Sequence, residues 1–195
     1  MSEADRRKWD ARYARSDFRA SAEASLFLRA HSSRIKPGRA LELACGAGRN
    51  AIYLARQGFS VDAIDISEQG LQHARAGAER AGVQVNWICA DLLAGDALPR
   101  DDYQLIVMTH FVAPSLLAKL GRYLAPGGWL LVEEHLRWPE PVAGPGGDRF
   151  RVAPGELHEA VPDLEAVEYF EGIIEGAAGA DMAVAQLLAR KSEDA

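Results

Sequence analysis

The chain of 195 residues has few cysteines, no excess of basic residues and no long apolar run. Its only two cysteines, Cys45 and Cys89, do not form a C-x-x-C pair, so they suggest neither a zinc site nor a redox disulfide. No His, Asp and Glu cluster has metal-ligand spacing, and we expect no metal. No apolar run approaches the roughly 18 residues of a membrane span, and the charged N-terminal residues lack the apolar core of a secretion signal. We therefore expect a cytoplasmic protein with no membrane partner.

Acidic residues outnumber basic residues by 28 to 22, which gives a formal net charge of −6. A nucleic-acid-binding protein needs a basic face or stripe. The basic cluster at residues 5–8 fits a solvated helix face instead, so we expect no nucleic-acid partner. The length is most simply that of one domain, and the sequence leaves monomer and homodimer both open.

Strand-like and helix-like stretches alternate through the middle of the chain. Apolar runs that read as strands occupy residues 39–43, 59–66, 83–90, 103–111 and 129–135, and helical spacing occupies residues 49–57, 68–81 and 115–124. Such alternation predicts an α/β fold of the Rossmann-like, doubly wound kind, with a mostly parallel sheet and helices on both faces.

Three segments depart from this alternation. Residues 137–155 hold four prolines and several glycines and predict a long loop, a feature that is usually functional or disordered. Residues 164–175 and 181–191 are strand-like runs with a short link, which predicts an antiparallel pair at the sheet edge. Residues 1–36 precede the first strand and read as helical. We expect one domain, in which residues 1–36 form a helical lid over a core of residues 37–195.

A glycine-rich turn follows the first predicted strand, in the stretch ALELACGAGRN of residues 40–50. Gly46-x-Gly48-x-x-Ala51 fits the dinucleotide-binding fingerprint, and Asp65 lies nineteen positions beyond Gly46, where that fingerprint places a ribose-binding acid. Glu42 does not fit a dinucleotide site as easily, because an unpaired carboxylate within an apolar strand is costly.

Three acids, Glu42, Asp65 and Asp91, lie at the ends of three successive predicted strands. In a parallel sheet these ends share one edge, where a pyrophosphate would meet several negative charges. Two unit charges about 4 Å apart cost on the order of 4 kcal/mol at an effective dielectric constant of 20. A ligand with an ammonium, a sulfonium, a ribose and an adenine is attracted instead. Singly, Asp65 also fits a helix cap and Asp91 a loop acid, but the ordered set favours S-adenosylmethionine over NAD.

The chain resembles the class I S-adenosylmethionine-dependent methyltransferases over nearly its whole length. The stretch LELACGAGRNAIYLARQGFSVDAIDIS is most similar to the small bacterial methyltransferases of the tellurite-resistance type, and GDRFRVAPGEL and the final LLARK also resemble that group. The resemblance implies a seven-stranded sheet with the last strand inserted antiparallel, and S-adenosylmethionine as the cofactor.

The resemblance also implies which residues contact the cofactor. Glu42 would serve the methionine amino end, Asp65 the ribose, and Asp91 with Leu92 the adenine, while an aromatic pair in the first helix would cover the bound molecule. The complete expected set is Trp9, Tyr13, Glu42, Ala44, Cys45, Gly46, Gly48, Asn50, Asp65, Ile66, Asp91, Leu92 and Thr109.

His110 and His135, at the ends of the fourth and fifth predicted strands, are the candidate catalytic residues, as a base or as acceptor-orienting groups; a purely structural role is the alternative. The stretch MTHFVAP lacks the Asp/Asn-Pro-Pro-aromatic sequence of methyltransferases that modify amides and exocyclic amines. We therefore expect a small-molecule acceptor with a thiol or another soft nucleophile, entering between the lid and residues 137–155. An NAD-dependent oxidoreductase and a non-catalytic S-adenosylmethionine-binding protein remain the alternatives.

Overall fold

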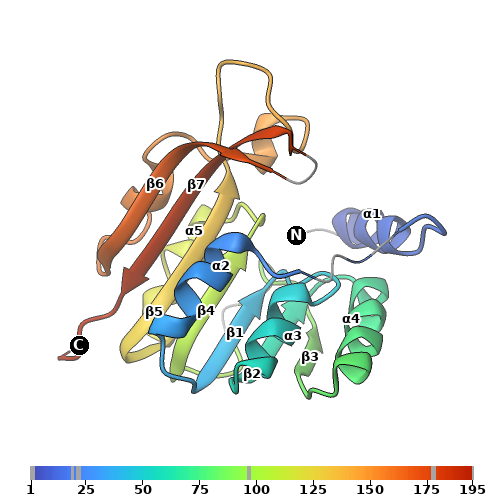
Figure 1. The fold of residues 1–195 in the computed structure, drawn as a ribbon, viewed down its shortest axis with the longest axis horizontal. Helices are drawn as coiled ribbons and strands as arrows, with labels where there is room; N and C mark the ends of the chain where they lie inside the picture. Colours follow the sequence, from blue (N-terminus) through green and yellow to red (C-terminus); the bar gives the residue numbers. More distant parts are fainter. Residues whose placement is uncertain (1–2, 19, 21–22, 96–97, 177–178, 195) are drawn as a thin grey trace.

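In the computed structural model, which describes residues 3–18, 20, 23–95, 98–176 and 179–194, seven strands form one sheet in the order β3-β2-β1-β4-β5-β7-β6 (Figure 1). The strands are β1 (Arg39–Leu43), β2 (Ser60–Asp65), β3 (Asn86–Cys89), β4 (Tyr103–Thr109), β5 (Leu124–His135), β6 (Glu165–Glu175) and β7 (Asp181–Arg190). The first five strands pair in parallel, and β7 lies antiparallel between β5 and β6. The expected seven-stranded sheet with an inserted antiparallel strand is confirmed.

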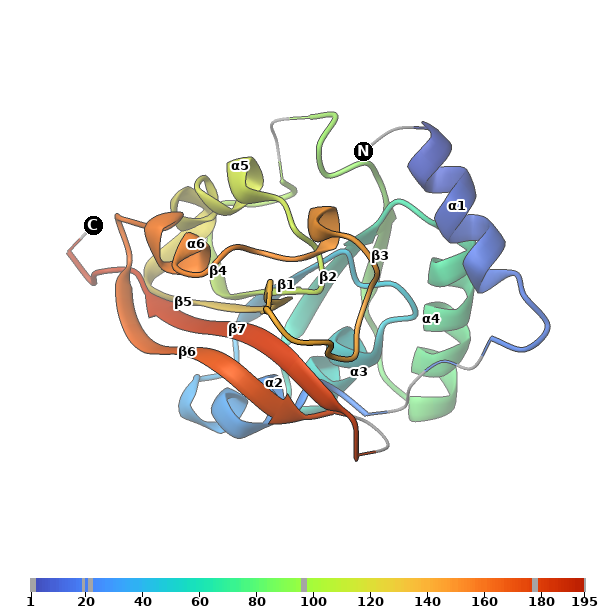
Figure 2. The same cartoon turned by 90° about the horizontal axis from the view of Figure 1, so that it is seen from above.

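Helices cover both faces of this sheet (Figure 2). On one face lie α2 (Leu26–His31), α3 (Arg49–Arg56) and α4 (Glu68–Ala81), which contribute Leu28, Leu54 and Leu71 to one apolar core. On the other face, the short α5 (Pro114–Leu117) and α6 (Glu156–Glu159) contribute Leu117 and Leu157 to a second core. Side chains alternate between the faces of each central strand, so both cores draw on β1 and β4.

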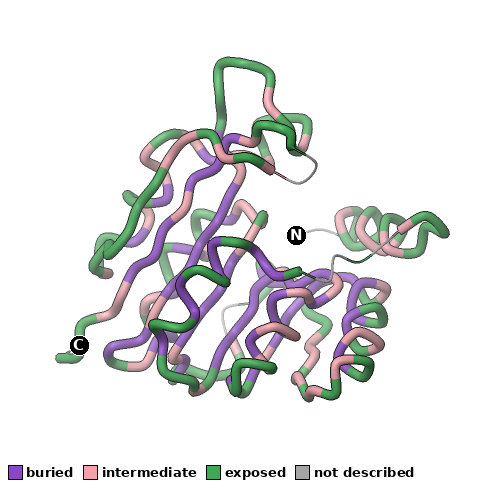
Figure 3. The backbone as a smooth tube through the Cα atoms, in the orientation of Figure 1, coloured by how far each residue is buried: buried purple, intermediate pink, exposed green. Residues whose placement is uncertain are grey.

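The central strands are buried, whereas the edge strand β6 is exposed along most of its length (Figure 3). In β4, five of seven residues are buried, in agreement with the near-continuous apolar run that a parallel strand covered on both faces requires. None of the described helices has the length and apolar character needed to cross a membrane.

The segment between β4 and β5 differs from the expectation of one helix over residues 115–124. It forms the single-turn α5 and a 3₁₀ helix, Leu120–Tyr123, and β5 already begins at Leu124. Gly127 and Gly128 therefore lie inside the strand, at a shift in its pairing with β4. A Cβ on Gly128 would come within 2.8 Å of the carbonyl oxygens of Ala125 and Tyr103, so glycine permits this close approach of two backbones.

Within the N-terminal region, which was expected to be helical, the described residues form two α-helices and the 3₁₀ helix Ser32–Arg34. The first, α1 (Glu3–Tyr13), contacts α4: Ser67 Oγ donates to Asp10 Oδ1 at 2.6 Å, and His73 Nε2 lies 2.9 Å from the Tyr13 carbonyl oxygen. The second, α2, begins where the Ser25 hydroxyl accepts the backbone N–H of Leu28.

Two glycines with positive φ, Gly48 before α3 and Gly82 after α4, allow a test of how tightly the N-terminus of α3 is packed. Gly48 has φ +78°, and a Cβ there would lie 2.5 Å from the Trp87 ring and 2.8 Å from the Ala74 Cβ; Gly82 has φ +66° with open space around it. We expect Gly82→Ala to cost about 1–2 kcal/mol of unfolding free energy through backbone strain alone. Gly48→Ala should cost about 1–3 kcal/mol more through overpacking. Urea denaturation measures both losses, and equal losses would contradict the packing role of Gly48.

Candidate active site

A cavity of about 630 Å³ opens at the carboxyl ends of β1, β2, β4 and β5, within the size range of small-molecule sites. It lies between α1 and the loop that follows β5. The predicted site residues that line it are Trp9, Tyr13, Glu42, Ala44, Cys45, Gly46, Asn50, Asp65, Ile66, Thr109, His110 and His135. Most of the residues chosen from the sequence therefore meet in one place.

Three predicted cofactor residues do not line this cavity. The space that a Gly48 Cβ would occupy is taken by Trp87 and Ala74, so this glycine packs α3 against its neighbours. The Asp91 Oδ1 atom accepts the backbone N–H of Leu93 at 2.8 Å, and Leu92 is buried in the core beneath α5. Cofactor contact by Gly48, Asp91 and Leu92 stays a prediction.

Several lining residues were not predicted from the sequence: Arg12, Phe18, Ala47, Arg49, Phe111, Gly144 and Pro145. Arg49 is the first residue of α3, directly after the glycine turn. A cation at a helix N-terminus is unfavourable with respect to the helix dipole, and that departure is the signal that marks Arg49 in the sequence. Arg12 precedes Tyr13 in α1, and its guanidinium lies 5.2 Å from the Trp9 ring.

Two carboxylates form the acidic wall of the cavity and also shape the glycine turn. Glu42, 2% exposed, accepts the backbone N–H of Ala51 at 2.7 Å. Asp65 accepts the backbone N–H of Gly46 at 2.7 Å and that of Ser67 at 2.8 Å. Burial raises the pKa of Glu42 to about 8, and burial also raises the pKa of Asp65. Asp65 thus ties β2 to the glycine turn and Glu42 ties β1 to α3, and Glu42 is mostly protonated near pH 7 until a cationic ligand beside it favours the ionised form.

Backbone strain coincides with the cavity. Of the described residues other than glycine, Ala44 (φ +53°) and His110 (φ +57°) are those with positive φ, and both line the cavity at strand ends. This conformation is uncommon for residues with a Cβ and concentrates at functional sites, where the surrounding structure holds it in place. At His110 the backbone N–H donates to the Glu133 carbonyl oxygen at 2.8 Å, which fixes the strained residue to β5.

Two imidazoles form the opposite wall. The rings of His110 and His135 stack with centroids 4.5 Å apart and planes 20° apart. Burial, assisted by Arg49, lowers the pKa of His110 to about 4; burial, with His110 and Arg151, lowers the pKa of His135 to about 4. Both rings are therefore neutral near pH 7 and can accept a hydrogen bond or a proton from a molecule in the cavity.

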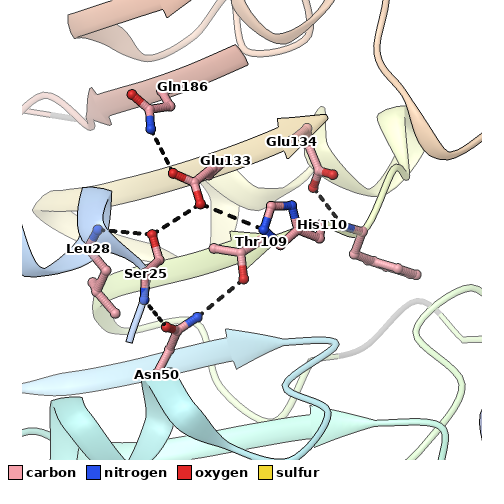
Figure 4. Close-up of polar contacts among 9 residues, drawn as sticks. Ser25, Leu28, Asn50, Thr109, His110, Glu133, Glu134 and Gln186 are labelled. Carbon is pink, nitrogen blue, oxygen red and sulfur yellow. Dashed lines mark hydrogen bonds and ion pairs between the residues drawn. The ribbon is translucent and has the colours of Figure 1, made fainter. Parts of the chain in front are cut away.

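A buried polar network connects this wall to the start of α2 (Figure 4). Glu133 accepts the Ser25 hydroxyl at 3.1 Å and the Gln186 amide at 2.7 Å. The Ser25 backbone N–H donates to Asn50 Oδ1 at 2.9 Å, and Asn50 Nδ2 donates to Thr109 Oγ1 at 3.2 Å. The network joins β4, β5, β7 and α3 behind the cavity and satisfies polar groups that burial would otherwise make costly.

The helix α1 and the loop after β5 meet at the mouth of the cavity. The Tyr13 hydroxyl lies over Gly46, where a Cβ would come within 2.5 Å of it, and Tyr13 stacks with Trp9 at 6.1 Å between centroids. The Lys8 ammonium lies 4.7 Å from the centroid of the Phe150 ring. Tyr13 is thus directed toward the glycine turn, and cover of the cofactor by Trp9 and Tyr13 stays a prediction.

Comparison with known proteins finds similar sequences among the methyltransferases. A family model described as "Methyltransferase domain" matches residues 40–128. The probable S-adenosyl-L-methionine-dependent methyltransferase TehB of Haemophilus influenzae is 27% identical over 146 residues, which cover 71% of this chain and 50% of TehB. The chain is thus similar in sequence to S-adenosylmethionine-dependent methyltransferases, and its seven-stranded sheet has the strand order of the class I fold.

Further comparisons agree with this assignment. An uncharacterised methyltransferase of Synechocystis, sll0829, is 34% identical over 119 residues, which cover 56% of this chain and 55% of that protein. The crystal structure of Haemophilus influenzae TehB superposes with a TM-score of 0.73 at 24% identity, covering 96% of this chain and 67% of that one. The predicted similarity to the tellurite-resistance-type group, and S-adenosylmethionine as the cofactor of the family, are confirmed. The chain spans about half the length of the curated TehB sequences it matches.

The raised pKa of Glu42 predicts a pH-dependent stability. The pKa is about 8 in the folded chain against an ordinary value of 4.5, so the folded state holds a proton that the unfolded state releases. This contribution to stability is present at low pH and is lost as the pH rises through the folded pKa. Between about pH 5 and pH 8 we expect the unfolding free energy of the wild type to fall by on the order of 3–5 kcal/mol relative to that of Glu42→Gln. Urea titrations across this range decide it, and parallel curves for the two proteins would show that Glu42 is ionised throughout.

Proposed function

We propose that this methyltransferase chain binds S-adenosylmethionine in the cavity and transfers the methyl group to a small molecule that carries a thiol or another soft nucleophile. The observation that supports the proposal is that carboxyl groups line one side of the cavity and neutral imidazoles line the other side. Glu42 and Asp65 offer negative charge beside the glycine turn, and the neutral rings of His110 and His135 face the same cavity.

The residues of the acidic wall suit S-adenosylmethionine. A ligand ammonium or sulfonium next to Glu42 favours its ionised form and offsets the effect of burial. Asp65 lies at the end of β2, where a carboxylate can accept hydrogen bonds from ribose hydroxyls in addition to the two backbone N–H groups it already binds. The absence of a Cβ at Gly46 leaves room for the Tyr13 hydroxyl, and Trp9 with Tyr13 would cover the bound molecule. The bound cofactor supplies a methyl group on a cationic sulfur.

The residues of the imidazole wall suit a small acceptor. Methyl transfer is an in-line displacement, and holding the nucleophile and the methyl carbon aligned can supply roughly 7–11 kcal/mol of barrier reduction. His110, His135 and Phe150 are placed to orient such an acceptor without bringing a second fixed positive charge beside the sulfonium. A thiol fits best because a fraction of it is already ionised near neutral pH.

Tellurite is the less favoured acceptor in this proposal. We expect the tellurite-resistance-type group to carry His and Arg between its last two strands, and residues 175–181 contain neither. The formal net charge of −6 and the cavity of about 630 Å³ favour a small molecule over a nucleic acid as the acceptor.

A lid role of α1 predicts a specific loss of affinity. We expect the double variant Trp9→Ala, Tyr13→Ala to bind S-adenosylhomocysteine about 10- to 100-fold more weakly, because aromatic contacts of this kind contribute about 0.5–1.5 kcal/mol each beyond their buried area. Arg7→Ala, on the exposed face of the same helix, is the matched control and should bind as the wild type does. Isothermal titration calorimetry measures all three proteins. Equal affinities would show that α1 has no role in binding the cofactor.

Turnover tests the proposed function. With radiolabelled S-adenosylmethionine, we expect transfer to organic thiols to exceed transfer to selenite, tellurite, catechols and amines, with none to protein or nucleic acid. Transfer to a macromolecule alone would contradict the small-molecule assignment. Binding of the cofactor with no transfer to any acceptor would favour the alternative of a non-catalytic S-adenosylmethionine-binding protein.

A further inference from the structure

Glu133 lies beside His110, and the sequence analysis did not predict it as a site residue. Its side chain is 6% exposed, and its Oε1 atom is 3.8 Å from His110 Nε2. A buried carboxylate is costly unless donors surround it. The Ser25 hydroxyl and the Gln186 amide hold this one from two sides, and His110 occupies a third (Figure 4). The carboxylate is therefore fixed in position against one edge of the imidazole.

A fixed carboxylate beside Nε2 selects a tautomer of the neutral ring. A hydrogen on Nε2 points positive charge at the carboxylate, whereas a lone pair there would be repelled, so the proton belongs on Nε2 and the lone pair on Nδ1. The strained backbone of His110 and its hydrogen bond to the Glu133 carbonyl oxygen hold the ring in place. Within the described part of the chain, no group donates a hydrogen bond to His110 Nδ1, and His110 lines the cavity.

We propose, on the basis of the proposed function, that Glu133 is a positioning residue that keeps the Nε2–H tautomer of His110, so that Nδ1 takes the proton of the acceptor. The favoured acceptor is then a protic nucleophile, a thiol that arrives with its hydrogen. Anions that carry no proton gain nothing from this arrangement.

The proposed step involves the thiol, His110 and the methyl donor. The thiol S–H bond breaks and its proton moves to His110 Nδ1, while the electron pair stays on sulfur. That sulfur forms the new bond to the methyl carbon, and the bond from the methyl carbon to the sulfonium breaks with its pair left on the departing sulfur. The positive charge of the donor thereby ends on His110, next to the Glu133 carboxylate.

Several charged and titratable groups face this pair. Arg49 of α3 opposes protonation of His110, and His135 stacks on its ring with Arg151 behind it. Glu134, the next residue of β5, is directed elsewhere: its Oε1 accepts the Phe111 backbone N–H at 2.8 Å. Glu133 opposes the lowering of the pKa of His135 and is the carboxylate that lies 3.8 Å from His110 Nε2, and Glu134→Gln is its matched control.

The tautomer can be read without any turnover. In the wild-type protein, ¹⁵N chemical shifts of labelled histidine at pH 7 should show His110 neutral, with a protonated Nε2 and a bare Nδ1. Glu133→Gln should mix the two tautomers, because the amide removes the negative charge, and Glu134→Gln should leave them unchanged. A proton on Nδ1 in the wild type would overturn the proposal even if no variant folds.

Kinetics with two kinds of acceptor complete the test. We expect Glu133→Gln to lower kcat for an organic thiol at least tenfold, with KM nearly unchanged, and to alter kcat for iodide or thiocyanate less than twofold. Glu134→Gln should change neither. Equal losses for both kinds of acceptor would overturn the role of Glu133. Absence of transfer to every acceptor would contradict the proposed function, while the tautomer measurement would still decide the role of Glu133.

Discussion

The site depends on two carboxylates that are buried at the ends of adjacent strands. Glu42 accepts the backbone N–H of Ala51 in the first turn of α3, and Asp65 accepts those of Gly46 in the glycine turn and Ser67 after β2. Without those hydrogen bonds the burial would be prohibitive, and without the carboxylates the backbone donors would lack partners. These hydrogen bonds therefore shape the glycine turn and hold two carboxyl groups beside it. In the proposed function a cationic ligand would favour their ionised forms, whereas a pyrophosphate would meet repulsion from them.

The opposite wall of the cavity is formed by two neutral imidazoles, and buried polar side chains pack behind them. His110 and His135 are desolvated enough to stay uncharged near pH 7. Glu133 lies behind this wall, and it accepts hydrogen bonds from the Ser25 hydroxyl and the Gln186 amide. Since Ser25 also caps α2, the start of this helix is anchored to the same network as the proposed acceptor wall.

Much of the fold could be predicted from the sequence because its signals are local. Alternating apolar runs predict the parallel sheet, and the short link before Asp181 predicts the antiparallel pair of β6 and β7. The site acids could be found for the same reason, since parallel strands bring their carboxyl ends together. Gly127 and Gly128 were misleading because a bulge inside a strand and a turn between elements use the same residues.

Other site residues depend on tertiary packing that no local pattern reveals. Gly48 faces Trp87 and Ala74 instead of the cavity, and only the position of β3 decides this. Arg12 reaches the cavity because α1 contacts α4. Glu133 does leave a signal, because Glu133 and Glu134 are consecutive acids in an apolar strand and so point to opposite faces of a sheet that is covered on both sides. This pattern predicts two buried carboxyl groups, each of which requires hydrogen-bond donors nearby.

The central claim is that the acidic wall binds a cationic adenosyl ligand and rejects a dinucleotide, and calorimetry tests it most directly. Titration of the wild type with S-adenosylhomocysteine and with NADH should give binding for the first and none for the second. Asp65→Asn should weaken the first by about 1.5–3 kcal/mol, the usual cost of lost hydrogen bonds to a charged group. Measurable NADH binding with no response to S-adenosylhomocysteine would contradict the account.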